Sequence, residues 1–451
     1  MVGVGNYIEN PDRFELVATG DSLICERISI FNEPGFLKVR EIVQGADVSF
    51  TNFETTIPNR RGFPRHKKDP TIWMASPSYV LDELKWMGFA LYSLANNHAM
   101  DYGEGGLLES LRAFNESKLV YAGAGRNLSE ARSPAYLNTP KAKVALIAMN
   151  TRDEDGPAGD AWGTVQGRPG VNPLRYVTTK YLPKKDFDRL VDICGKLGLP
   201  QPREGGVNLL GLRHIESVDR FEIGDSAEVR TEPYRPDYEG NIKSIAEAKR
   251  NADLVFVSIH NHEKLRPGEE YFDDTIEEIP GFVETFSRAA IDAGANAVLG
   301  HGTHVINGIE IYKGCPIFYG LGNFISQSHE TIPQPYDWYE ARGLQDEKQS
   351  KYRPRNRRPT FDRTILPIGL AAERRSRRLT TGLIARISFE RGRAKEVLLY
   401  PIELVAKHPQ GGRPLLASGS SADEILGRVS RLSAKYGTRI SVDRDVGRIK
   451  M

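Results

Sequence analysis

Short apolar runs alternate with helix-forming segments along this chain, and most of the runs end at a polar residue. Each run has the length and composition of a buried strand. Ser76 and Pro77 mark one helix start, because a capping serine stands before a proline at the first helical position. Strands that alternate with helices predict βαβ units and a layered α/β fold. The predicted strands cover residues 14–19, 47–53, 89–94, 120–122, 144–149, 254–259 and 296–299.

The chain has 451 residues, which exceeds the roughly 250–300 at which a single hydrophobic core stops growing. We therefore expect a large domain over residues 1–330, with an insertion at about 151–240 that shapes a cleft. Residues 331–380 read as an irregular, basic segment. Residues 381–451 contain two strands and an amphipathic helix, which we expect to complete the fold as a small α+β extension.

Composition narrows the class of protein. Apolar residues make up 39% and charged residues 27% of the chain, and the formal net charge is +2, so no overall field favours nucleic acid or a membrane surface. The three cysteines are scattered and predict neither a disulfide framework nor a cysteine metal site. The N-terminus lacks the features of a signal peptide, and no apolar run is long enough to span a bilayer. We expect a cytoplasmic protein that does not insert into membranes or bind nucleic acid.

The stretch from Gly300 to His304 carries two imidazoles three residues apart at the end of a predicted strand. Glycines at 300 and 302 allow the backbone to approach a bound ion or substrate closely. Neutral imidazole is a common metal ligand, and two on one loop can bind one ion or two neighbouring ions. On its own, the stretch fits a metal site and an ordinary polar loop about equally well.

Polar residues of ligand type stand at the carboxyl ends of successive predicted strands, where open α/β sheets place their sites. Five of the nine histidines fall in these short motifs. Carboxylate, amide oxygen and imidazole without thiolate suit divalent Mn, Fe or Zn. The recurring residues are Asp21, Glu54, Asn97, His98, His260, His262, His301 and His304.

At these residues the sequence resembles the bacterial CapA group of poly-γ-glutamate and capsule biosynthesis proteins, within the calcineurin-like metallophosphoesterase superfamily. The matching motifs are Thr19-Gly20-Asp21, Asn52-Phe53-Glu54, Leu94-Ala95-Asn96-Asn97-His98 with Asp101, His260, Gly300 to His304, and 309–324. The resemblance implies a four-layer α-β-β-α sandwich of the metallophosphoesterase type. It implies a substrate that is a peptide-like or anionic polymer.

The resemblance also implies roles for individual residues. A site of one or two divalent ions would activate water for hydrolysis of an amide or phosphoester bond. His98 would act as an acid with Asp21 and His304 as further catalytic groups. The implied metal ligands are Asp21, Glu54, Asn97, His260, His301 and His304. The implied substrate-binding residues are Arg168, Asn172, His262 and Asn323.

Two positions depart from the superfamily pattern and keep a second hypothesis open. Leu23 stands where the first motif has a histidine, and Glu54 replaces the bridging aspartate. A metal-independent enzyme could use Asp21 facing His304 as two bases that exchange a proton beside a carbonyl of a peptide, as in an epimerase.

The basic segment supports a third hypothesis, a non-catalytic factor in polymer assembly. Two clusters of cations could hold an anionic chain, although a solvated surface loop is the explanation that the composition favours. The clusters are Lys351, Arg353, Arg355, Arg357 and Arg358, and Arg374, Arg375, Arg377 and Arg378.

Overall fold

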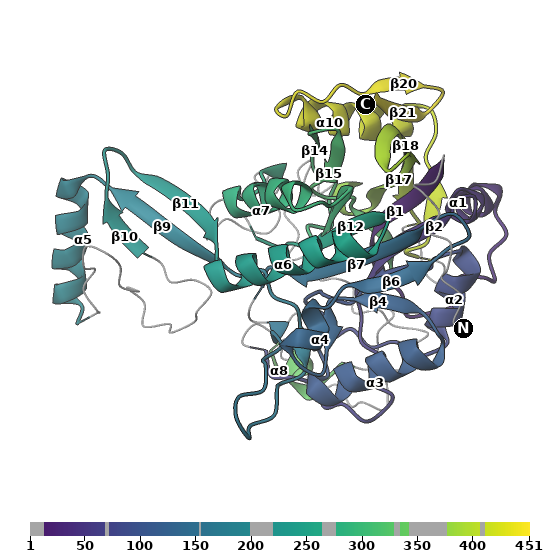
Figure 1. Ribbon diagram of the computed structural model, residues 1–451. Helices are drawn as coiled ribbons and strands as arrows, with labels where there is room; N and C mark the ends of the chain where they lie inside the picture. The colour runs from purple at the N-terminus through teal and green to yellow at the C-terminus, as the bar shows by residue number, and fades with distance from the viewer. Residues whose placement is uncertain are drawn as a thin grey trace, which may run out of the picture.

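The computed structural model describes residues 13–67, 72–152, 155–198, 220–263, 277–328, 334–341, 377–405 and 411–451. Two β-sheets form the centre of the molecule (Figure 1). Across the first sheet the strands are β20 (Ser441–Asp443), β21 (Val446–Lys450), β18 (Arg393–Leu404), β17 (Thr381–Glu390), β1 (Phe14–Leu23), β2 (Val48–Phe53), β3 (Leu91–Ser93) and β4 (Val120–Ala122). Beside this path, β16 (Asn323–Ser326) pairs with β1, and β19 (Pro414–Leu416) pairs with β18.

The second sheet is mixed, with a parallel centre. Its strands β7, β12, β13 and β15 run parallel, while β6 and β14 pair antiparallel at the two edges. In order they are β14 (Ile309–Tyr312), β15 (Cys315–Phe318), β13 (Ala297–His301), β12 (Leu254–His260), β7 (Lys143–Asn150) and β6 (Ala135–Asn138).

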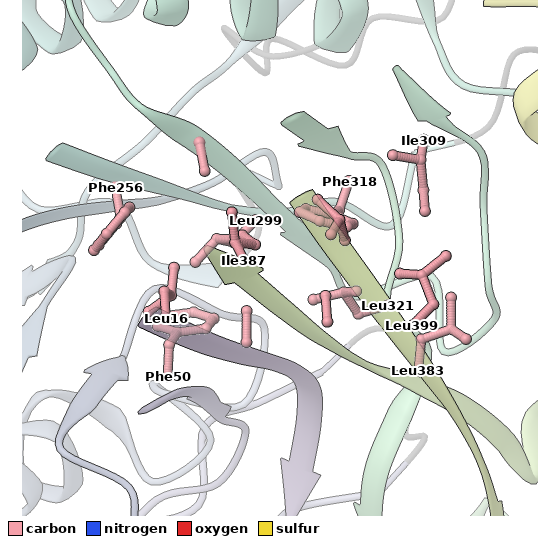
Figure 2. Packing of buried hydrophobic residues seen from close by; sticks show 14 of the residues in the cluster. Leu16, Phe50, Phe256, Leu299, Ile309, Phe318, Leu321, Leu383, Ile387 and Leu399 are labelled. Atoms are coloured by element: carbon pink, nitrogen blue, oxygen red, sulfur yellow. The ribbon is translucent and has the colours of Figure 1, made fainter. Parts of the chain in front are cut away.

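The two sheets pack face to face through a buried apolar core (Figure 2). Leu16 and Phe50 of the first sheet meet Phe256 and Leu299 of the second in this core. Because successive side chains of a strand point to opposite faces, Val17, next to Leu16, instead joins the cluster on the outer face. Strands β1, β2, β7 and β12 are buried on both faces, which explains why β7 and β12 read as nearly continuous apolar runs.

Helices cover both outer faces, so the predicted four-layer α-β-β-α arrangement is confirmed. On the first sheet, Phe36, Val39 and Val43 lie on one side of a helix and pack against the strands. The outer helices of this sheet are α1 (Pro34–Gln44), α2 (Val80–Met87) and α3 (Gly103–Glu116). Those of the second sheet are α6 (Arg235–Asn251) and α7 (Gly281–Asp292).

The C-terminal part contributes to the same core. Strand β17 pairs antiparallel with β1, from Phe14 opposite Phe389 to Ala18 opposite Ala385. Helix α10 (Ser420–Ala434) packs Leu426 and Val429 into the core between the sheets. Of the basic clusters, Arg377 and Arg378 are described, whereas Lys351 to Arg358, Arg374 and Arg375 lie outside the described residues.

The predicted insertion contains two different pieces. In the first piece, β8 (Gly170–Val171) pairs with β5 (Ala124–Gly125), which precedes the predicted insertion, as does the short helix α4 (Leu128–Arg132). The other piece extends away from the body as an arm (Figure 1). The arm consists of β9 (Tyr176–Leu182), β10 (Arg220–Ile223), β11 (Glu228–Pro233) and α5 (Lys184–Lys196). A further short helix, α8 (Tyr336–Glu340), follows the second sheet in the chain.

Two boundaries differ from the sequence prediction. Helix α2 begins at Val80, not at Pro77, because the Ser76 hydroxyl bonds to Thr55 and to the carbonyl of Ile24 instead of capping a helix. Strand β1 continues past Asp21 to Leu23, because β16 supplies a new parallel partner at that point. Among the described residues, no helix combines the length and apolarity needed to cross a membrane.

Gly20 allows the close approach that fixes Asp21. A Cβ at residue 20 would lie 1.8 Å from the carbonyl oxygen of Gly322, and that same oxygen accepts a hydrogen bond from the Asp21 amide at 3.1 Å. The clash is with backbone, so no side chain can rotate to relieve it.

We predict that Gly20→Ala lowers the free energy of unfolding by about 1–3 kcal/mol, the usual cost of overpacking. Gly427 in α10 is the control, because a Cβ there meets nothing within 4 Å. Gly427→Ala should leave stability unchanged or raise it by up to about 1 kcal/mol. Urea unfolding of the two variants and wild type measures both effects; equal stability of Gly20→Ala and wild type would contradict the assignment.

Candidate metal centre

The carboxyl ends of parallel strands from both sheets meet at one place. Strands β1 and β2 set Asp21 beside Asn52, and strands β12 and β13 set His260 beside His301. The contact between Asp21 Oδ1 and His301 Nδ1, at 3.3 Å, joins the two sheets. The loops that follow these strands and β3 supply the remaining polar side chains, Glu54, Asn97, His98, His262 and His304.

One group of donor atoms consists of Asp21, His260 and His301, all fully buried. His260 Nδ1 and His301 Nδ1 face each other at 3.0 Å, and Asp21 Oδ1 lies 3.3 Å from His301 Nδ1 and 3.9 Å from His260 Nδ1. At this distance one ring N–H can donate to the other ring nitrogen, or both nitrogens can face a cation. With Asp21 they form a group that could hold a metal ion.

Glu54 forms the centre of a second group. Its Oε1 atom lies 3.6 Å from His304 Nε2 and 3.9 Å from the Nε2 atoms of both His260 and His262. The atom is buried and has no hydrogen-bond partner among the described residues. An unsatisfied buried carboxylate oxygen is costly, so a cation near it explains the arrangement.

These residues fit a divalent metal ion. Bonds of about 2.0–2.2 Å to nitrogen and oxygen put neighbouring donor atoms roughly 3.0–3.5 Å apart, close to the spacings observed in the first group. In a third group, Asp21, Glu54 and His304 offer donor atoms within 4.8 Å of one another. The groups share Asp21, Glu54 and His260, so they describe one pocket with overlapping positions.

The two carboxylates have opposite electrostatic environments. Burial raises the pKa of Asp21, but the hydrogen bonds and charges of His301 and His304 outweigh it and hold that pKa well below its ordinary value. Burial, followed by the charge of Asp21, raises the pKa of Glu54 well above its ordinary value. Burial lowers the pKa of His260 and His262, which keeps both imidazoles neutral and able to bind a metal.

Backbone geometry places the imidazoles of the loop after β13. Gly302 has a φ of +99°, and a Cβ there would lie 2.8 Å from the amide nitrogen of Asn261. The Gly302 N–H donates to Asp21 Oδ2 at 3.0 Å. His304 adopts a φ of 58°, a left-handed conformation that is uncommon for a residue other than glycine and that recurs at functional sites.

Neighbouring polar residues hold these donors in position. Asn52 donates to Asp21 Oδ1 at 2.9 Å and lies 3.3 Å from His260 Nδ1. Ser258 Oγ and His301 Nε2 are 2.7 Å apart. His304 Nδ1 donates to Asn323 Oδ1 at 2.9 Å, so Asn323 contacts the cluster through a ligand-type residue.

Asn97 and His98 lie on the loop after β3. Asn97 Oδ1 accepts from His260 Nε2 at 3.1 Å, which brings the predicted amide ligand to the cluster. His98 Nδ1 donates to Asp101 Oδ2 at 2.6 Å, and its side chain is almost completely buried. Burial lowers the pKa of His98 and outweighs the opposing effect of Asp101.

Three of the predicted residues have no recorded hydrogen bond or ion pair with the donor residues: His98, whose ring bonds to Asp101, and Arg168 and Asn172. Arg168 is exposed and donates to the carbonyl of Pro157. Asn172 is buried and donates to the carbonyl of Ala148 and to Asn241. A role of either residue in substrate binding stays a prediction.

Sequence reasoning missed two residues and assigned a third to a different role. Asn52 and Ser258 were not singled out, although Asn52 lies in a matched motif and Ser258 is the polar residue inside the apolar run of a predicted strand. His262 was assigned to the substrate, yet the structure includes it in a donor group with Glu54 and His260. Its position two residues beyond His260, at the end of the same strand, was the available signal.

Known proteins match this chain over most of its length. The family described as bacterial capsule synthesis protein PGA_cap matches residues 15–328. The uncharacterized protein y4sH of Sinorhizobium fredii is 31% identical over 448 residues, 98% of this chain and 94% of that protein. The PGA biosynthesis protein CapA of Bacillus subtilis is 27% identical over 290 residues, 64% of this chain and 56% of that protein. A solved structure of a hypothetical protein from Thermus thermophilus has 16% identity and a TM-score of 0.41, covering 86% of this chain and 99% of that chain.

We predict that Glu54→Gln stabilises the metal-free protein at pH 8 and weakens metal binding. The raised pKa of Glu54 means that ionising it in the folded state costs free energy as pH rises through that pKa. A glutamine removes this cost, so the variant should gain about 1–2 kcal/mol at pH 8, and the gain should shrink as pH falls and wild-type Glu54 becomes protonated.

Urea unfolding in the presence of a chelator, at pH 5 and pH 8, measures this difference, and calorimetric titration with zinc or manganese measures binding. Glu116→Gln is the control, since Glu116 is an exposed residue at the end of α3. A variant that is less stable than wild type at pH 8 and binds metal normally would contradict the assignment of Glu54.

Proposed function

Because the chain belongs to the bacterial capsule synthesis protein family PGA_cap, we propose that it is a metal-dependent hydrolase of capsule or poly-γ-glutamate metabolism. The bond that it cleaves is an amide of a peptide-like polymer or a phosphoester. A capsule-polymer substrate is supported by the name of one relative, the PGA biosynthesis protein CapA. The membership alone does not select a reaction, because one fold can host many chemistries.

One observation carries the proposal. Two buried carboxylates and four imidazoles converge at the meeting point of two sheets, and one carboxylate oxygen there has no hydrogen-bond partner among the described residues. Burying ionisable groups together costs several kcal/mol unless a partner compensates them. A divalent Mn, Fe or Zn ion, in one or two positions, fits that donor set.

Different residues of the chain would hold the ions at the two positions. Asp21, His260 and His301 would hold one ion, and Glu54, His262 and His304 would contribute to a neighbouring position, with Asn97 beside His260. The metal supplies Lewis-acid polarisation of the substrate and lowers the pKa of water.

His98 would protonate the leaving group. Its Nδ1–H is committed to Asp101, so the proton that it gives would be the one at Nε2 of the protonated ring, and the neutral ring left behind would keep its Nδ1–H. Asn323 would orient His304 through its 2.9 Å hydrogen bond, and this contact fixes the Nδ1 proton of His304. That leaves His304 Nε2, the atom nearer Glu54, as the metal-binding nitrogen.

The geometry favours hydrolysis over the two-base epimerase. An epimerase needs its two bases on opposite sides of a substrate carbon, whereas Asp21 Oδ2 and His304 Nδ1 are only 3.3 Å apart. No carbon fits between atoms at that separation. A purely non-catalytic assembly role would not explain why the chain buries Asp21 and Glu54 together at a cost in folding free energy.

We predict that removing divalent metal with a chelator abolishes hydrolysis and that adding metal back restores it. The substrate panel contains γ-glutamyl peptides and an aryl phosphodiester, which separate amide from phosphoester cleavage. His301→Ala should lower kcat/KM at least about 100-fold, because metal polarisation is worth several kcal/mol.

His66→Ala is the matched control, since the side chain of His66 is 82% exposed and the residue belongs to none of the donor groups. It should retain wild-type activity and metal content, measured by elemental analysis. Full activity of the metal-free protein, or of His301→Ala, would overturn the proposal.

A further inference from the structure

We propose that Lys67 is a positioning residue for His98 and acts by fixing the Asp101 carboxylate. The proposal rests on the proposed function, since it assigns Lys67 a part in orienting the proton donor of that reaction. No motif contains Lys67, which lies 31 positions before His98 in the sequence. The inference comes from the contacts of the folded chain.

The Asp101 carboxylate is held at both oxygens. Oδ2 accepts from His98 Nδ1 at 2.6 Å and from the Met74 N–H at 2.7 Å. Oδ1 forms an ion pair with Lys67 Nζ at 2.7 Å. A carboxylate anchored at only one oxygen can rotate about its last bond, whereas Asp101 is fixed in the plane that presents Oδ2 to His98.

Lys67 is itself immobilised, unlike most lysines. Its side chain is only 12% exposed. The ammonium donates to the carbonyl of Ile72 at 2.7 Å and lies 4.9 Å from the centre of the Trp73 ring, a cation–π contact. The ammonium is thus placed by three separate contacts, and the ordering cost that weakens surface ion pairs does not apply here.

The backbone on either side of Lys67 is hydrogen-bonded to the turn that carries Asp101. Trp73 is fully buried and donates from its indole N–H to the carbonyl of Arg65 at 2.9 Å. The Arg65 N–H donates to the Asp101 carbonyl at 2.9 Å. Lys67 and Asp101 therefore lie on backbone segments that are joined independently of their ion pair, so its loss would not by itself release the loop.

The charge of Lys67 decides what Asp101 can do for His98. Burial raises the pKa of Asp101, but Lys67 and then His98 outweigh it and lower that pKa. An ionised Asp101 only accepts hydrogen bonds, so it requires the Nδ1–H tautomer of neutral His98. Without Lys67, Asp101 keeps the Met74 N–H and His98 as partners but loses the contact that fixes its second oxygen.

A purely structural role for Lys67 makes a different prediction. A brace between residue 67 and the turn at residue 101 would affect stability alone and leave the tautomer of His98 unchanged. The test must therefore read the state of the His98 ring directly and separately from turnover.

The experiment uses the full chain labelled with ¹⁵N-histidine, metal-free, at pH 8, and compares Lys67→Met, Lys67→Arg and wild type by NMR. The His98 signals are those that disappear in His98→Gln. Wild type should show the Nδ1–H tautomer, Lys67→Met should show shifts averaged between the two tautomers, and Lys67→Arg should restore the wild-type pattern. Lys67→Gln replaces Lys67→Met if the latter does not fold.

Lys141→Met is the matched control, because Lys141 also pairs with an aspartate, Asp47 at 2.8 Å, but its side chain is half exposed and unconnected to His98. On any substrate that wild type hydrolyses, Lys67→Met should lower kcat about 10–100-fold with little change in KM, the usual effect of losing such an outer partner.

An unchanged His98 tautomer in a folded Lys67→Met protein overturns the inference, whatever the activity. If wild type hydrolyses nothing in the panel, the proposed function fails, and the NMR comparison still decides whether Lys67 orients His98. An altered tautomer in Lys141→Met would also overturn it, because the effect would then be unspecific.

Discussion

The burial of two carboxylates within 4.8 Å of each other, away from water, is the constraint on which the rest of the site depends. Like charges this close in a low dielectric repel strongly, so both cannot be ionised without compensation. The chain supplies four imidazoles, an amide group and a backbone N–H around them. The lowered pKa of Asp21 and the raised pKa of Glu54 are the two sides of the same conflict.

The repulsion between the Asp21 and Glu54 carboxylates explains why the donor residues come from both sheets. A single sheet edge could offer Asp21 and Glu54 side by side, but the neutral nitrogen donors would be missing. The second sheet brings His260 and His301 against them, with the φ of +99° at Gly302 and the left-handed backbone of His304 completing the approach. The left-handed backbone of His304 and the burial of the two carboxylates cost stability, as is common at functional sites.

Much of the fold could be predicted from the sequence, because central strands such as β7 and β12 are buried on both faces and read as apolar runs. The convergence of Asp21, Glu54, Asn97, His260 and His301 could be expected for the same reason, since parallel strands end at a common edge. Asn52 and Ser258 could not be predicted as site residues, because the role of an amide or hydroxyl in a strand depends on which side chain faces it in the folded protein. Lys67 could not be selected at all, because its contact with Asp101 depends on a loop with no periodic pattern.

Strand β1, which carries Asp21, lies between β2 and β17 in the first sheet. On one side Leu16 pairs with Val48, which follows soon after it in the chain, but on the other side Phe14 pairs with Phe389. Contacts of such long sequence separation form slowly and late in folding. A nascent chain on the ribosome therefore exposes one edge of β1 until residues 381–390 have been made. The edge of β1 from Phe14 to Ala18 is consequently covered only after every strand that carries a donor residue has been made.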